Sequence, residues 1–139
     1  MDELYSAELK LRVEADDPAA LFEYAVILSE TDKAESDKYM KLSAQLGHLP
    51  ALEKAGEIYL AEGDTANAAH CFKTCAKAGM YDCAVKLAVI KIENDETAAV
   101  RELEELAVSG IESACAALAE YYAKNHNKRE AAYWRSVLK

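Results

Sequence analysis

The segment GHLPALEKAGEIYLAEGDTANAAHCFKTCAKAG, residues 47–79, decides the fold of this chain. It begins and ends at a glycine, and Gly110 follows Gly79 after a further 31 residues. Small residues return at two fixed offsets from these glycines: Ala51, Cys83 and Ala114 at the fourth position, and Gly56, Ala88 and Ala119 at the ninth. A period of this length indicates a supersecondary unit that buries its apolar face only by stacking on its neighbours.

A second periodic set of residues marks helix starts. Asp32, Asp64, Asp95 and Asn127 are spaced by 32, 31 and 32 residues, and each precedes a segment with apolar residues at helical spacing. Side chains of this kind accept hydrogen bonds from the open amides of a helix's first turn. We therefore expect each unit to be helix, polar turn and helix, with the glycine as the left-handed stop of the second helix.

The same frame placed on Asp16 adds a first unit that no glycine marks. The repeats then cover about residues 16–46, 47–78, 79–109 and 110–139, in one domain that spans 1–139. We expect nine helices, near 3–14, 18–29, 33–45, 50–61, 65–77, 81–92, 96–108, 112–124 and 128–138. The predicted fold class is all-α, an α-solenoid of about four helix-turn-helix repeats after an N-terminal half-repeat helix with Leu4, Leu9 and Val13 on its buried stripe.

Small and aromatic residues in a fixed order give the repeats a family resemblance. The second repeat carries Leu52, Ala55, Gly56 and Tyr59, then Ala68, Phe72 and Ala76; the fourth carries Leu118, Ala119, Tyr122, Ala131 and Trp134. Over residues 16–139 this order resembles the Sel1-like and tetratricopeptide families of helical repeats. The choice between the two families stays open, because the repeats lack the longer glycine-rich inter-helix loop of the Sel1-like pattern.

The resemblance implies a non-catalytic scaffold or adaptor that binds a peptide or a partner helix on a concave face lined by the first helix of each repeat. Carried over by position, the partner-binding residues are Phe22, Val26, Glu53, Glu57, Leu60, Val85, Val89, Ile92 and Glu120, with Ala116 and Ala123 beside them. Such a face suits a ligand with an apolar stripe and basic flanks. In a second interpretation Val85, Val89 and Ile92 simply pack on adjacent helices.

A different class of function places the activity at the end of the chain. The last expected helix offers Tyr133, Trp134, Val137 and Leu138 with no polar helix after it, although terminal repeats normally need a polar outer face. The alternative function is therefore a self-assembling structural protein that forms a weak homodimer through its C-terminal helix. The same side chains could instead turn inward.

Charge and hydropathy bound the partners and the location. The formal net charge of −9 argues against a nucleic-acid partner, since phosphate neutralisation needs a basic face. Residues 124–139 differ, because five lysines and arginines against Glu130 give +4 there and −13 for residues 1–123. This contrast is compatible with head-to-tail association, but we favour the simpler interpretation that basic side chains in a last helix turn complement the helix dipole. Neither a targeting segment nor an apolar run of membrane-spanning length is present, so we expect a cytoplasmic protein without membrane contact, unless the sequence is a processed product.

The polar and thiol side chains do not form a recognisable catalytic or metal-binding pattern, so we expect no enzyme activity, no cofactor and no metal. All four cysteines fall on helix faces expected to pack, where cysteine behaves as a small apolar residue. The spacing of Cys75 and Cys83 is similar to the disulfide spacing of cysteine-rich Sel1-like proteins. Without a secretory signal, however, we expect both to remain reduced.

Overall fold

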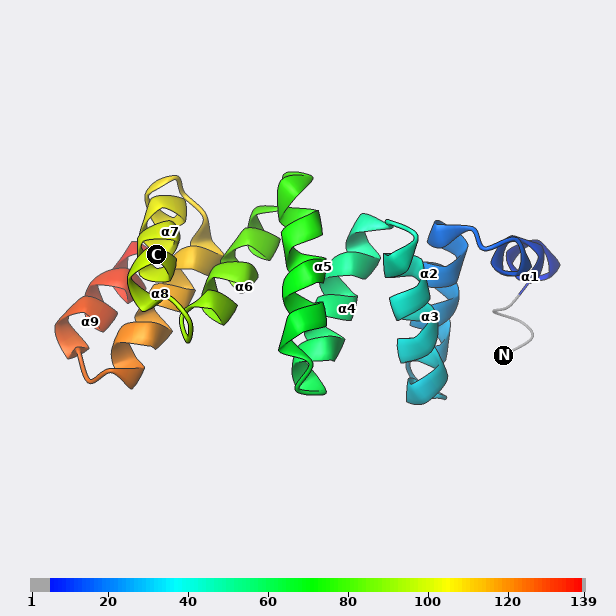
Figure 1. Cartoon of the computed structure of the whole chain (residues 1–139), viewed down its shortest axis with the longest axis horizontal. Coiled ribbons are helices and arrows are strands. Elements are labelled where there is room, and N and C mark those ends of the chain that lie inside the picture. Colours follow the sequence, from blue (N-terminus) through cyan, green and yellow to red (C-terminus); the bar gives the residue numbers. More distant parts are fainter. Residues whose placement is uncertain (1–5, 139) are drawn as a thin grey trace. The chain divides into compact units, whose positions relative to one another are not determined.

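A computed structural model describes residues 6–138, and within these residues every regular element is an α-helix (Figure 1). The chain divides into two compact units, residues 1–78 and 79–139. The first unit holds α1 (Ala7–Glu14), α2 (Pro18–Leu28), α3 (Lys33–Gln45), α4 (Leu49–Ala61) and α5 (Thr65–Lys77). The second holds α6 (Tyr81–Lys91), α7 (Glu96–Val108), α8 (Glu112–Lys124) and α9 (Lys128–Val137). The all-α repeat fold is confirmed, and the unit boundary falls between the second and third expected repeats.

The predicted helix starts are confirmed by their capping bonds. The side chains of Asp32, Asp64, Asp95 and Asn127 accept hydrogen bonds from the backbone amides three residues later, at 3.1 to 3.2 Å. Each bond satisfies one of the amides that a first helical turn leaves without a backbone partner. From α2 to α9 every observed boundary lies within one residue of the predicted one.

The glycine stops are also confirmed, and one stop uses another residue. Gly47, Gly79 and Gly110 have φ values of 90°, 98° and 97°, in the left-handed region that glycine adopts without strain. Asp16, at the equivalent place in the first repeat, has φ of 57°. The missing glycine of that repeat is therefore replaced by an aspartate that adopts the same left-handed turn.

The first helix begins later than its apolar pattern suggested. The Ser6 side chain accepts a hydrogen bond from the Leu9 amide at 3.2 Å, so that Ser6 caps the helix and α1 begins at Ala7 instead of residue 3. Leu9 and Val13 are buried as expected, and Leu4 lies outside the described residues.

In the first unit, α4 and α5 cross closely at Gly56. A Cβ atom at this position would lie 2.6 Å from two ring carbons of Phe72, which is completely buried. Two buried serines of α3 donate hydrogen bonds to α2: Ser36 Oγ to the Ala25 carbonyl and Ser43 Oγ to the Pro18 carbonyl, both at 2.6 Å. Small side chains thus let the helices of this unit approach each other closely.

In the second unit one apolar cluster joins all four helices. It contains Val85, Ala88, Leu103 and Ala107 of α6 and α7, with Ala114, Cys115, Leu118, Ala119 and Trp134 of α8 and α9. Trp134 therefore turns inward, whereas its neighbour Tyr133 is 56% exposed. The exposed C-terminal aromatic surface expected from the sequence is reduced to Tyr133.

The cysteines differ from the prediction. Cys71 and Cys115 are buried free thiols, and burial raises the pKa of the Cys71 thiol. Cys75 and Cys83 are both disulfide-bonded, so the expectation that they stay reduced is wrong. That expectation rested on the inferred compartment, although the spacing of seven intervening residues is compatible with disulfide geometry.

Candidate interaction surface

In the first unit, α2 presents two of the predicted partner-binding residues. Val26 is 50% exposed, and Phe22 is half-buried with its ring tilted against that of His48, the residue that precedes α4, at a centroid distance of 5.0 Å. This ring contact connects the exposed side of α2 to the start of α4. Phe22 is therefore held in place by the fold and leaves part of its ring accessible.

A shallow groove of about 490 Å³ runs beside these two residues between α1 and α2. Its rim carries Arg12, whose Nε lies 2.9 Å from Asp17 Oδ2 and whose Nη1 lies 3.5 Å from Glu23 Oε2. The hydrogen bond from Arg12 lowers the pKa of Asp17 below its usual value. Sequence reasoning missed Arg12 and Glu23, since their pairing depends on how α1 packs on α2.

On α4 the predicted acidic and apolar residues lie toward solvent. Glu57 is exposed, Glu53 is half-buried and Leu60 is 40% exposed. Nearby, Lys41 of α3 reaches α4: its Nζ lies 2.8 Å from Glu62 Oε1 and 4.7 Å from the centre of the Tyr59 ring. Lys41 thus fixes the C-terminal end of α4, a role that its sequence position did not reveal.

In the second unit the three apolar candidates on α6 divide by exposure. Val89 is 45% exposed and stays available, whereas Val85 is 4% exposed and belongs to the core cluster. Ile92 is half-buried and packs against the same cluster. The prediction that Val85 contacts a partner is therefore wrong, because the packing of α7 and α8 covers its side chain. This matches the second interpretation of the sequence for Val85 and, in part, for Ile92.

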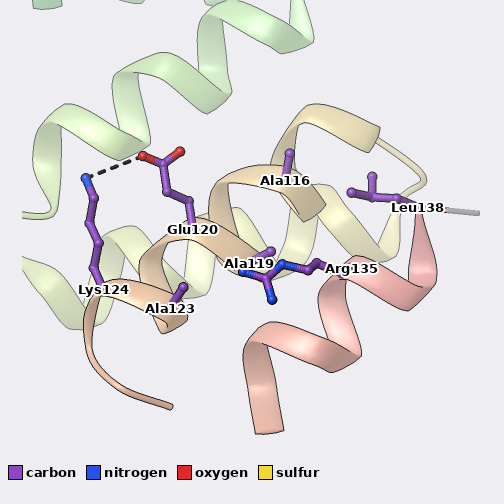
Figure 2. Close-up of a pocket in the computed structure, with 7 residues that line it drawn as sticks. All are labelled: Ala116, Ala119, Glu120, Ala123, Lys124, Arg135 and Leu138. Carbon is purple, nitrogen blue, oxygen red and sulfur yellow. Dashed lines mark ion pairs between the residues drawn. The ribbon is translucent and has the colours of Figure 1, made fainter. Parts of the chain in front are cut away.

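Glu120, the last predicted residue, lines a hollow of about 500 Å³ between α8 and α9 (Figure 2). It is lined by Ala116, Ala119 and Ala123 of α8 together with Arg135 of α9 and Leu138, the C-cap of α9; we call these five residues the terminal groove. At its edge Glu120 pairs with Lys124, with 3.4 Å between Oε1 and Nζ, and both side chains are more than two-thirds exposed. Such an exposed pair contributes little to stability. Arg135 and Leu138 were not predicted as site residues.

One position follows a pattern across the four first helices. Each repeat has an exposed residue ten positions after its first residue (Asp16, Gly47, Gly79 or Gly110): these residues are Val26, Glu57, Val89 and Glu120. The place therefore alternates between valine and glutamate along the chain.

The described residues contain neither a cluster of metal-binding side chains nor a membrane-spanning helix. Among the described residues no group of three or more histidines, cysteines, aspartates or glutamates could hold a metal ion. Within residues 6–138, no helix is long and apolar enough to cross a membrane.

Comparisons with known proteins identify the fold. No protein-family model matches the sequence, and no curated protein matches it. Among solved structures, the chain is similar to the crystal structure of a Sel1 repeat protein from Oxalobacter formigenes, with a TM-score of 0.62 and 21% sequence identity. The match covers 94% of this chain and 61% of that one, so the chain spans less than two thirds of that structure's length. The chain thus has the fold of a Sel1 repeat protein, as the resemblance implied.

Proposed function

We propose that this chain is a non-catalytic scaffold that binds a peptide or a helix of a partner protein through the exposed sides of its first helices, α2, α4, α6 and α8. The observation that carries the proposal is the repeated exposure of aliphatic side chains on these helices. Val26, Leu60 and Val89 are 50%, 40% and 45% exposed, although their helices also supply much of the core. Covering such side chains with a partner removes apolar surface from water and is favourable.

The acidic residues on the same helices suggest the chemistry of the ligand. Glu57 and Glu120 alternate with Val26 and Val89 at one repeat position, and the whole chain carries a net charge of −9. A ligand with aliphatic side chains and lysines or arginines between them would match this alternation. Complementary charge would mainly favour fast encounter and correct partner choice.

The test compares two lysine variants of one unit. Val26→Lys combined with Leu60→Lys introduces charge on the first helices, and Leu46→Lys introduces it at the end of α3, where Leu46 is 46% exposed. The tagged proteins are used to capture partners from cells that make the protein, with quantitative mass spectrometry. We expect one protein set to be recovered with wild type and Leu46→Lys and lost with the double variant. Equal recovery by all three would contradict the proposal.

Self-assembly through the C-terminal helix is the second candidate, and one observation favours it. Tyr133, Val137 and Leu138 of the last helix and its cap are 56%, 45% and 38% exposed. A molar mass that rises with concentration, measured by light scattering, and that stays monomeric in Tyr133→Glu, would establish this function.

A cytoplasmic location stays a prediction, and one observation argues against it. Cys75 and Cys83 are disulfide-bonded, and structural disulfides are rare where glutathione and thioredoxin keep thiols reduced. Fractionation of the cells that make the protein tests the location directly.

A further inference from the structure

The terminal groove has a filled counterpart within the same unit. There, α8 packs against both α6 and α7, so a first helix occupies the groove between the two helices of the preceding repeat. Ala114, Cys115 and Leu118 of α8 share one apolar cluster with Val85, Ala88 and Leu103 of that preceding repeat. In the first unit, likewise, α4 packs against α3.

Each residue of the terminal groove corresponds to a residue of the filled groove. The repeat spacing pairs Ala116 with Val85, Ala119 with Ala88, Ala123 with Ile92, Arg135 with Leu103 and Leu138 with Leu106. All five counterparts lie in the cluster that holds α8 or pack against it. In the terminal groove, by contrast, Ala116, Ala123, Arg135 and Leu138 are exposed. The groove therefore has the position and the floor of a helix-binding site and is covered by no described residue.

One substitution changes the chemistry of this groove. Arg135 stands where the preceding repeats have Met40, Phe72 and Leu103, which are 7%, 0% and 0% exposed. Lys124 at the edge is paired with Glu120, but Arg135 makes no ion pair with any residue between 6 and 138. The sequence around it, residues 124–139, carries a net charge of +4. A helix bound in the terminal groove would contact Arg135 at the position where α8 contacts Leu103.

We propose that the terminal groove binds an acidic amphipathic helix of a partner protein, with small and aliphatic side chains against the three alanines and Leu138 and a carboxylate against Arg135. Arginine suits this role, because its planar guanidinium can hold a carboxylate with two parallel hydrogen bonds. The groove shares Ala116, Ala123 and the edge residue Glu120 with the proposed first-helix surface, whereas Arg135 and Leu138 do not belong to that surface. Arg135→Glu therefore tests the groove, and the Val26→Lys and Leu60→Lys variant tests the first helices of the first unit.

The probe is a first helix of this chain, α4, which packs against α3, the second helix of the preceding repeat. A fluorescein-labelled peptide of residues 48–62, which includes α4, offers the apolar residues Ala51, Leu52 and Ala55 and three glutamates. A side-chain lactam holds it helical, since an isolated helix of this length is marginal in water. The control peptide has lysine at the positions of Glu53, Glu57 and Glu62. Fluorescence anisotropy with the whole protein measures binding.

We expect the acidic peptide to bind and the lysine peptide to bind at least about tenfold more weakly. Arg135→Glu should weaken binding of the acidic peptide by about tenfold or more, whereas Arg129→Glu, the same charge change on exposed α9 surface outside the groove, should change it less than about threefold. Both variants should keep the circular dichroism of the wild type.

Three results would overturn the proposal. The first is no binding of either peptide to the wild type. The second is an equal loss of binding in Arg135→Glu and Arg129→Glu, which would indicate attraction by net charge alone. The third is that the wild type binds no peptide but dimerises as its concentration rises, and that Arg135→Glu abolishes this dimerisation. The occupant of the groove would then be a second copy of the chain.

Discussion

Replacing Gly56 with alanine tests the closest helix contact in the first unit. The added Cβ would lie 2.6 Å from Cε1 and Cζ of Phe72 and 3.0 Å from Cδ1. Carbon atoms in contact normally lie about 3.5–4.0 Å apart, so the ring would have to move by about 1 Å. Phe72 is completely buried, so its ring can move only by displacing the atoms packed around it.

Two opposing effects set the expected free energy of unfolding. Overpacking a close core contact costs about 1–3 kcal/mol, whereas alanine is favoured over glycine inside a helix by about 1 kcal/mol. We expect the clash to dominate and Gly56→Ala to lose about 1–2 kcal/mol. Gly56→Leu should lose more, because its side chain adds further atoms at the same place.

Urea unfolding followed by far-ultraviolet circular dichroism measures this loss. Lys54→Ala and Lys54→Gly, at an exposed position of the same helix, calibrate the helix-propensity term. Phe72→Leu in the Gly56→Ala background should recover part of the loss by removing ring atoms. The difference in stability between Lys54→Ala and Lys54→Gly gives the gain expected from helix propensity alone. If Gly56→Ala is more stable than wild type by that full amount, the helices do not cross tightly at Gly56.

Three further predictions concern a turn, the thiols and acid stability. Asp16→Gly should raise stability by about 0.5–1 kcal/mol, since glycine adopts φ of 57° without the strain of a side chain, and a lower melting temperature would contradict this. In denatured, unreduced protein only Cys71 and Cys115 should react with a thiol reagent, and four thiols should react after reduction; four before reduction would refute the bond. Hydrogen bonds lower the pKa of Asp17 and Asp64 in the folded protein, so their stabilisation is complete above the unfolded value of about 4 and is lost as the pH falls through the lower folded values. Asp64→Asn keeps a capping oxygen that does not titrate, so its stability in urea should fall less between pH 5 and pH 2 than that of wild type. An equal fall in both proteins would show that the titration of Asp64 does not contribute to acid unfolding.

Helix positions could be predicted from the sequence because their determinants are local. A capping carboxylate such as Asp64 needs only the next three residues, and a left-handed stop such as Gly79 needs only its own backbone freedom. The start of the first helix could not be predicted from its apolar spacing. Its apolar spacing extends toward residue 3, yet the Ser6 cap, a weaker signal, sets its start at Ala7.

Exposure could be predicted only in part, since it depends on contacts between repeats. Val85 and Val89 lie one helical turn apart on the same helix, but only Val85 is covered by the cluster that holds α8. Arg135 looked like one of several basic residues near a helix end. Its place on the floor of the terminal groove follows from the packing of α9 on α8, which no local pattern encodes.

The most direct test of the central proposal, partner binding through the first helices, is carboxyl footprinting of the protein with and without a captured partner. Carbodiimide labelling of exposed carboxylates, read by mass spectrometry, reports which ones the partner covers. Glu57 and Glu120 should lose most of their labelling in the complex, while Glu104 and Glu105 on α7, also exposed, keep theirs. Protection of Glu104 and Glu105 with unchanged labelling of Glu57 and Glu120 would place the partner on the second helices and contradict the proposal.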